Sequence, residues 1–395
     1  MNTFQIPSLF DHHSHFSLYS SLSAMPSLAE VKDHGYACDI IRGSSSGAVT
    51  IVQGWNSSFF NLTSGDLGEE KPVIVLNLSL HGMIMNRPAE EYLSRSYSDI
   101  ARNCNDRSWT EKNIPLIFRM ISDLASPSAE DIRSFGNSLI ETGIRAMEDM
   151  LLPDSHWLEL IPHSPAVVDF WADEEVFAAL TSQEREKVKG VKLFTDGALG
   201  TKTAALSAQY LSGEKGILIM NEDNIIEKFH YYMKQGVPVA VHAIGDLAVD
   251  QVVKTVGILR RERGCSGPVR LEHAQFITGY AAFTAKDAGI TLSMQPNFST
   301  DSLMYADRLP EGYAAQNNPF RMLIDKAGFV PGRDMLFGSD GMPHGIKSAL
   351  QSALFPPFSG QVLSLQEFID GYCLPGTENE WFVQVENDSV AVFPL

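Results

Sequence analysis

The sequence predicts an α/β protein whose main body is a (β/α)8 barrel, the TIM barrel. Apolar runs of strand length alternate with amphipathic segments of helix length along almost the whole chain, which is typical of parallel strands joined by helices. Eight such strands suit a closed barrel better than an open doubly wound sheet. No Gly-x-Gly-x-x-Gly motif follows the first strand, so a dinucleotide-binding fold is not indicated.

Each element is placed by where an apolar run or an amphipathic pattern begins and ends. The helix that starts at Ser128 has a capping box, and glycine ends it at Gly143. Strands are expected at 6–10, 72–78, 144–150, 191–194, 237–241, 268–271, 289–294 and 333–337. Further helices are expected at 27–32, 89–103, 171–180, 224–235, 247–263, 278–288, 318–327 and from 364 onward.

The chain is expected to divide into a long barrel and a short terminal segment. Residues 1–373 would form the barrel. Residues 374–395 would form a small β-hairpin, because two strand-like runs, 381–385 and 389–393, flank the turn-forming pair Asn387-Asp388.

Composition excludes several classes of protein. At 395 residues the chain can bury a large core. A formal net charge of −18 argues against nucleic acid or an anionic membrane as a partner. No apolar run is long enough to cross a membrane, and the N-terminus does not resemble a signal peptide. Four widely spaced cysteines without a CxxC pair fit free thiols in the cytoplasm.

Three histidines follow the first expected strand, in the stretch DHHSH at 11–15, and two of them, His13 and His15, are two positions apart. Residues two apart on a strand share a face, so His13 and His15 would point into one cavity. Two imidazoles placed in this way can bind one metal ion. In a chain with 11 histidines such a pair also arises by chance. A pair of surface histidines is therefore the alternative unless other strands add ligands.

The strand at 191–194 contains a lysine within an apolar run. Burying Lys192 is costly unless something pairs with it, and no acid stands at strand spacing, so a partner must come from elsewhere. Burial lowers the pKa of a lysine and makes the amine nucleophilic. After uptake of CO2 the side chain would be a carbamate, an oxygen ligand able to bridge two metal ions.

Three further predicted strands lead into residues of metal-ligand type, His242, His273 and Asp340. The C-terminal ends of all barrel strands meet at one face. A single histidine at a strand end is usually structural, but six residues of ligand type at or near the ends of five strands indicate a site for one or two divalent ions. Imidazole and carboxylate ligands favour zinc.

Short stretches between residue 11 and about residue 343 carry a resemblance to a known family. They are DHHSH (11–15), GWN (54–56), LHGMIMN (80–86), IRAMEDM (144–150), VKLFTDGALGTKTAAL (191–206), VAVHAIGDLAVD (239–250), RLEHAQF (270–276), SMQPN (293–297) and GSDGMP (338–343). In content and order these stretches resemble the metal-dependent amidohydrolase superfamily, specifically its YtcJ-like branch, amidohydrolase family 3. The resemblance implies a TIM barrel that hydrolyses a C–N bond in an amide, or a related cyclic or ester bond.

The resemblance also implies how the site is built. His13 and His15 would bind the more buried metal with Asp340, and an N-carboxylated Lys192 would bridge to a second metal. The full implied ligand set is His13, His15, Lys192, His242, His273 and Asp340. A water held by the metals would be the nucleophile.

Two residues are given catalytic roles by the resemblance. Asp340 would accept the proton of the attacking water and pass it to the leaving group. His81, at the end of the 72–78 strand, would help to polarise the scissile carbonyl; a hydrogen-bonded structural histidine is the alternative. A deaminase or decarboxylase on the same site, or a non-catalytic metal-binding scaffold, are the other functions left open.

The substrate is expected to be a small molecule that the sequence does not identify. Trp55, Asn86, Lys202 and Asn297 lie in the matching stretches and are expected to contact it. Lys202 stands where relatives commonly carry arginine, which changes how an acidic group would be held. Relatives commonly begin with half of a β-sandwich; this chain is expected to lack that half and to keep 374–395 as a reduced remnant, which leaves a homo-oligomer open.

Overall fold

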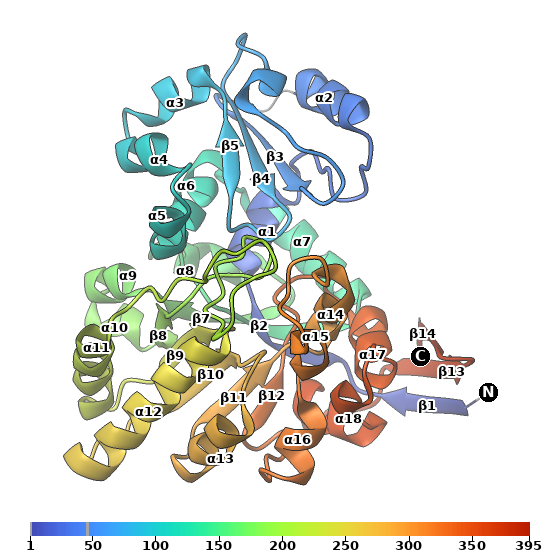
Figure 1. Cartoon of the computed structure of the whole chain (residues 1–395). Coiled ribbons are helices and arrows are strands. Elements are labelled where there is room, and N and C mark those ends of the chain that lie inside the picture. The colour runs from blue at the N-terminus through green and yellow to red at the C-terminus, as the bar shows by residue number, and fades with distance from the viewer. Residues whose placement is uncertain (1, 45–46) are drawn as a thin grey trace.

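An eight-stranded parallel sheet forms the centre of the computed structural model, which describes residues 2–44 and 47–395 (Figure 1). Its strands run in the order β12-β11-β10-β9-β8-β7-β6-β2, and β2 and β12 approach each other again. The sheet is therefore a nearly closed (β/α)8 TIM barrel, as predicted. Its strands are β2 (Leu9–Ser14), β6 (Ile144–Asp149), β7 (Val167–Ala172), β8 (Val188–Phe194), β9 (Val239–Ala243), β10 (Val269–His273), β11 (Thr291–Met294) and β12 (Met335–Phe337).

The barrel closes where the segment after β12 meets β2. The backbone nitrogen of Asp340 donates to the carbonyl oxygen of His13 at 2.7 Å. The Asp11 carboxylate accepts from the backbone nitrogen of Ser339 at 2.8 Å. A Cβ on Gly338 would collide with the backbone nitrogen of His13, so only glycine allows this approach. The closure thus holds two of the expected metal ligands, His13 and Asp340, against each other.

One predicted barrel strand is wrong. The stretch 72–78 does contain a strand, β4 (Val73–Asn77), but this strand pairs outside the barrel. Its place is taken by β7, whose end was predicted as the start of a helix. Only the second half of β7 is buried, so its pattern is weak. The following helix, α9 (Glu174–Ala179), starts at its cap Asp173, directly after the strand.

The chain between β2 and β6 forms a second body over one end of the barrel, seen at the top of Figure 1. Its three-stranded sheet consists of β3 (Thr50–Trp55), β4 and β5 (Met83–Met85). Both faces of this sheet are buried, because Val73 and Val75 belong to one apolar cluster, and Ile74 and Leu76 to another. Fully buried strands look alike in sequence wherever they lie, so the expectation of one barrel over 1–373 missed this body.

The two ends of the chain meet in a third sheet. The hairpin expected in the terminal segment is present as β13 (Trp381–Glu386) and β14 (Ser389–Pro394). Its turn residues, Asn387 and Asp388, both have positive φ, +48° and +58°, the backbone that Asn and Asp tolerate best. The strand β1 (Asn2–Ile6), which the sequence did not predict, pairs with β13.

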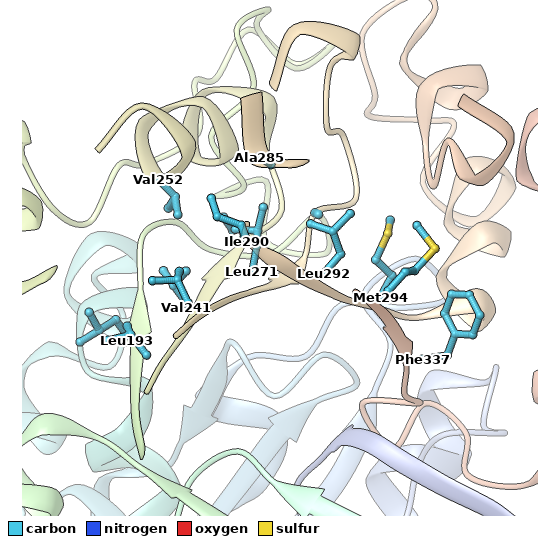
Figure 2. Packing of buried hydrophobic residues seen from close by; sticks show 14 of the residues in the cluster. Leu193, Val241, Val252, Leu271, Ala285, Ile290, Leu292, Met294 and Phe337 are labelled. Atoms are coloured by element: carbon cyan, nitrogen blue, oxygen red, sulfur yellow. The ribbon is translucent and has the colours of Figure 1, made fainter. Parts of the chain in front are cut away.

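The helices cover the barrel and the second body. Figure 2 shows Val241, Leu271 and Leu292 of the barrel strands beneath helix residues such as Val252 and Ala285. The helix expected at 27–32 is absent, because Ser27 bridges to Gln53 of β3 instead. The helices are α1 (Phe16–Leu22), α2 (His34–Gly43), α3 (Arg87–Leu93), α4 (Ser98–Asn103), α5 (Arg107–Lys112), α6 (Ile114–Ala125), α7 (Ala129–Glu141), α8 (Trp157–Leu160), α9 (Glu174–Ala179), α10 (Ser182–Arg185), α11 (Glu222–Lys234), α12 (Asp246–Arg263), α13 (Gly279–Asp287), α14 (Asp301–Met304), α15 (Tyr313–Gln316), α16 (Phe320–Asp325), α17 (Ile346–Leu354) and α18 (Leu365–Tyr372).

Two further expectations bear on the whole chain. Among the described helices, none combines the length and the apolar character needed to cross a membrane. All four cysteines, Cys38, Cys104, Cys265 and Cys373, are buried free thiols.

Candidate metal centre

One cavity at the C-terminal end of the barrel strands brings the expected ligands together. The cavity is partly open to solvent. The barrel and the second body both contribute walls, since Leu80 and Phe118 line it beside the strand ends. The expected residues that line it are His13, His15, His81, Lys192, His242, His273 and Asp340.

His13, His15 and Asp340 form the tightest group of donors. The Oδ1 atom of Asp340 lies 3.2 Å from Nε2 of His15 and 3.6 Å from Nε2 of His13. One ligand atom from each residue lies within 4.8 Å of the others. Burial raises the pKa of Asp340, but the neighbouring His13 and His15 outweigh it and hold this pKa well below its usual range. An ionised carboxylate between two imidazoles fits a divalent cation.

The orientation of His13 is set by a buried acid that the sequence analysis missed. Nδ1 of His13 lies 2.6 Å from Oε2 of Glu272, whose other oxygen accepts from Nε of Arg270 at 2.5 Å. Burial raises the pKa of Glu272, but Arg270 and His13 lower it to about 2. Glu272 is therefore ionised and holds a proton on Nδ1, which leaves Nε2 of His13 free to bind a metal. The only signal in the sequence was its position next to His273.

His242 and His273 stand next to this group. The ring of His273 lies with its centroid 4.6 Å from that of His13 and 4.6 Å from that of His242. Nδ1 of His273 lies 2.8 Å from Oε1 of Gln295. Burial lowers the pKa of His273 far below its ordinary value, so the ring is neutral and can act as a ligand. His273 also has a positive φ of +66°, a costly backbone for a histidine that clusters at functional sites.

His242 is held from behind by the loop after β8. Its Nε2 lies 3.2 Å from the carbonyl oxygen of Gly197 and 3.3 Å from Oδ1 of Asp196. A proton on Nε2 serves these acceptors and leaves the Nδ1 lone pair for a metal. Asp196 is itself fixed, because the backbone nitrogens of Ile244 and Gly245 donate to it at 3.0 and 2.8 Å. The sequence analysis did not predict a role for Asp196.

Lys192 carries an amine that the described residues leave without a hydrogen-bond partner. Its side chain is only 2 % exposed, and Nζ lies 5.4 Å from the ring centroid of Phe194. Burial lowers the pKa of this amine to about 8, against the opposing charges of Glu272 and Asp340. An orphaned buried amine beside three imidazoles is costly in isolation. An unpartnered amine beside these imidazoles fits a lysine that is chemically converted into a metal ligand.

His81 enters the cavity from the second body. Its Nδ1 lies 2.7 Å from Oε2 of Glu111 on α5. Thr201 and Thr203 donate to the other oxygen of Glu111 at 2.9 and 2.6 Å. Burial lowers the pKa of His81, but Glu111 outweighs it and the pKa is raised. Glu111 was not predicted as a site residue. It lies 30 positions after His81 in the sequence, and only the fold brings the two side chains into contact.

Two residues expected to contact the substrate do not line the cavity. Asn86 is buried as the cap of α3: it accepts from the backbone nitrogens of Val73 and Ala89 and donates to the carbonyl oxygens of Gly68 and Lys71. Lys202 turns toward the surface, where its Nζ donates to Ser212 at 2.8 Å and pairs with Glu214 at 3.1 Å. Their positions give both residues structural roles.

The other two expected contacts also lie outside the cavity. Trp55 donates from Nε1 to the carbonyl oxygen of Phe60 at 3.0 Å and lines a neighbouring shallow hollow that shares Ser79 and Tyr305 with the cavity. Asn297 donates from Nδ2 to the carbonyl oxygens of Ser339 and Met342 at 2.8 and 2.6 Å. Asn297 thus positions the loop that carries Asp340 and does not face the cavity.

The far wall of the cavity combines aromatic rings with hydrogen-bond acceptors. Phe298 and Tyr305 both line the cavity. Gln275 donates to Oδ2 of Asp301 at 2.9 Å, while its own Oε1 has no partner among the described residues. Burial raises the pKa of Asp301 to about 7. Neither Gln275 nor Asp301 was predicted as a site residue.

Comparison with known proteins agrees with this geometry. The model of the amidohydrolase family matches residues 157–346, the part of the chain that supplies Lys192, His242, His273 and Asp340. The candidate amidohydrolase YtcJ of Bacillus subtilis (strain 168) is 25 % identical over 312 residues, which cover 70 % of this chain and 59 % of that protein. The chain is therefore similar to the amidohydrolase family over these residues.

Another relative and two solved structures extend the similarity. Protein LONG AFTER FAR-RED 3 of Arabidopsis thaliana is 30 % identical over 115 residues, 28 % of this chain and 20 % of that protein. The chain thus spans 59 % or less of the length of these curated relatives. Two crystal structures share the fold of this chain. They are uncharacterized metal-dependent hydrolases from Pyrococcus horikoshii OT3 (TM-score 0.67, 22 % identity, 89 % of this chain, 75 % of that chain) and Pyrococcus furiosus (TM-score 0.66, 22 % identity, 93 % and 81 %).

Proposed function

We propose that the protein is a metal-dependent hydrolase that cleaves the C–N bond of an amide or cyclic amide in a small molecule. Similarity to the amidohydrolase family supports this reaction. The observation that carries the proposal is the set of six donor side chains around one cavity, with the amine of Lys192 buried and unpartnered among them. Such a cluster of polar groups is costly to bury unless it binds something.

The donors divide into two sets. His13, His15 and Asp340 would hold one ion, and His242 and His273 would hold a second. Lys192 would be the shared ligand as a carbamate. We propose zinc because the donors are imidazole nitrogens and carboxylate oxygens.

Carbamate formation requires a neutral amine at Lys192. A pKa of about 8 leaves about a tenth of the amines neutral at pH 7. The amine nitrogen adds to the carbon of CO2, a new N–C bond forms, and one proton passes to solvent. The product carries a negative charge where the free side chain would carry a positive one, so it attracts cations into the cavity.

The side chains of this protein would then divide the reaction between them. The bound metal ions would supply Lewis-acid activation of the carbonyl and of a water. Asp340, ionised between His13 and His15, would accept a proton and deliver it to the leaving nitrogen. His81, oriented by Glu111, would donate a hydrogen bond to the carbonyl oxygen as negative charge develops there.

The cavity wall supports a small substrate with a partly apolar body. Phe298 and Tyr305 offer aromatic faces, and Asp301 with Gln275 offers acceptors for a donor group of the substrate. We also propose a cytoplasmic enzyme, which the four free cysteines support.

The test combines metal analysis with an assay of product. Purified full-length protein from zinc-replete growth should contain bound zinc, and it should release an amine and a carboxylic acid from members of a panel of amides and cyclic amides. A chelator should abolish this activity and added zinc should restore it. Absence of any bound transition metal would instead favour a scaffold. Release of ammonia from an amidine-like carbon, or of CO2, without amide cleavage would favour a deaminase or decarboxylase.

A further inference from the structure

A second group of metal-ligand side chains lies in the body above the barrel. His34 and Cys38 stand four positions apart on α2, so they lie on the same face of this helix. Asp66 comes from the short 3-10 helix Ser64–Leu67, which packs against α2. None of the three residues lines the barrel cavity. The group is therefore independent of the proposed catalytic site.

The spacing of the three donor atoms fits a tetrahedral metal site. Nε2 of His34 lies 3.3 Å from Oδ1 of Asp66 and 3.8 Å from Sγ of Cys38, and all three atoms lie within 4.8 Å of one another. Zinc bonds of about 2.0–2.1 Å to nitrogen and oxygen and about 2.3 Å to sulfur place tetrahedral ligands about 3.3 Å apart for N···O and about 3.6 Å apart for N···S. The observed separations are close to these values.

We propose that His34, Cys38 and Asp66 form a structural zinc site with water as the fourth ligand. The sulfur and imidazole donors select a borderline cation such as zinc over magnesium or calcium, which prefer oxygen alone. The fourth position is open to water because the His34 side chain is 48 % exposed.

The three donors are held ready for an ion. Oδ2 of Asp66 accepts from the backbone nitrogen and the hydroxyl of Thr63, both at 2.7 Å, so its Oδ1 is left to face His34. The ring of His34 packs edge-on against Phe60, with the centroids 6.2 Å apart. Cys38 is 4 % exposed, so its Sγ is fixed within the apolar cluster. Little side-chain freedom remains to be lost on binding.

The proton balance of binding involves the thiol alone. Burial, with the charge of Asp66, raises the pKa of the Cys38 thiol, while hydrogen bonds from Thr63 lower the pKa of Asp66. The ion-free site therefore holds a thiol and a carboxylate. Zinc forms a bond to the sulfur, and the thiol proton leaves to solvent.

The site would tie two distant parts of the body together. The segment from Cys38 to Asp66 contains β3, the first strand of the small sheet. Metal binding to residues at both ends of this segment stabilises the folded arrangement over the open chain. The same body supplies Leu80 and His81 to the barrel cavity, so the site would stabilise one wall of the catalytic centre without touching it.

Cobalt substitution tests the site in the full-length protein. Co²⁺ bound to a thiolate gives an intense near-ultraviolet charge-transfer band, and the barrel cavity has no cysteine among its described lining residues. The wild-type protein loaded with Co²⁺ should show this band, and Cys38→Ser and His34→Gln should lose it. Cys104→Ser, which removes another buried thiol of the same body, should keep the band. Elemental analysis should show one zinc fewer per chain in His34→Gln than in the wild type.

A further variant distinguishes the proposed zinc site of His34, Cys38 and Asp66 from the barrel site. Lys192→Ala should lower total metal and leave the thiolate band unchanged, so failure of the proposed function does not affect the outcome. A wild-type protein without the band, or a zinc content that is equal in His34→Gln and the wild type, would overturn the proposal. The three side chains would then be joined by hydrogen bonds only. Because His34 is half-exposed, His34→Gln decides the question even where Cys38→Ser fails to fold.

Discussion

Nδ1 of His13 lies 2.6 Å from the carboxylate of Glu272, and this contact determines which nitrogen of His13 faces the cavity. Glu272 in turn pairs with Arg270, which also pairs with Glu148. A metal-binding histidine commonly donates its other N–H to such a carboxylate. The buried ion pairs therefore connect the interior of the barrel to the proposed metal site.

Removal of this acid should weaken metal binding and stability together. Glu272→Ala leaves Arg270 short of a partner and His13 without its acceptor, so we expect a loss of about 3–5 kcal/mol in the free energy of unfolding and about 10–100-fold weaker zinc binding. Denaturant unfolding and competition with a chelator measure the two effects. Glu262→Gln, at an exposed position of α12, is the control. Unchanged zinc affinity in Glu272→Ala would contradict the orienting role.

Asp340→Asn should separate proton transfer from folding. The amide keeps the shape of the carboxylate but cannot accept a proton, so kcat should fall by about a hundredfold or more while the thermal midpoint changes little. Much of the metal should remain, because His13 and His15 are untouched. Turnover assays with zinc analysis check this. Activity within a few-fold of the wild type would show that another group accepts the proton.

Lys192→Ala should lower the metal content. Without the amine no carbamate forms, so the second ion loses its shared ligand, and added bicarbonate should fail to restore either metal or activity. The matched control is Lys254→Ala, an exposed lysine on α12. Elemental analysis of both proteins gives the answer. Full metal content in Lys192→Ala would mean that the histidines and Asp340 suffice.

Glu111→Gln should shift the pH profile of the reaction. The charge of Glu111 raises the pKa of His81, so its removal lowers this pKa. If protonated His81 donates to the substrate, activity is lost as pH rises through the pKa of His81, and that alkaline limb should move to lower pH. KM should change less than kcat, since the interaction grows as charge develops on the carbonyl oxygen. If the alkaline limb of the pH profile of kcat stays at the same pH in Glu111→Gln, the role of Glu111 is purely structural.

The metal-free protein should lose stability as pH falls. The folded pKa of His13 is about 4, against 6.5 for free histidine, and that of Glu272 is about 2, against 4.5. Between pH 6.5 and 4 for His13, and between pH 4.5 and 2 for Glu272, the unfolded chain binds more protons than the folded one. Stability therefore falls with acid through both windows, by roughly 3 kcal/mol for the coupled pair. Chemical denaturation at a series of pH values measures this; Glu272→Gln should flatten the lower window.

The sequence predicts the barrel and most of its strands because parallel strands and helices alternate with clear patterns. It also predicts seven of the residues that line the cavity, six of them because the ends of the barrel strands gather at one face. The second body escaped prediction because β4 is as apolar as a barrel strand, and β7 was misread because only its second half is buried. Pattern alone does not tell which sheet a buried strand joins.

The residues that orient the site, Glu272 and Glu111, could not be predicted from the sequence for a different reason. Glu272 meets His13 across 259 positions, and Glu111 meets Thr203 across 92. No local spacing encodes such contacts. Asn86 and Asn297 show the opposite error: both lie in motif-like stretches, yet both hold loops in place by bonding backbone atoms.

The seam that joins β2 to the segment after β12 has a consequence for how the protein matures. Asp11 and Ser339, 328 positions apart, meet there, and His13 and Asp340 stand beside them. A chain emerging from the ribosome cannot assemble the proposed site of His13, His15 and Asp340 until Asp340 has been synthesised. Incomplete chains that end before Asp340 should therefore be unable to bind the ion proposed for His13 and His15.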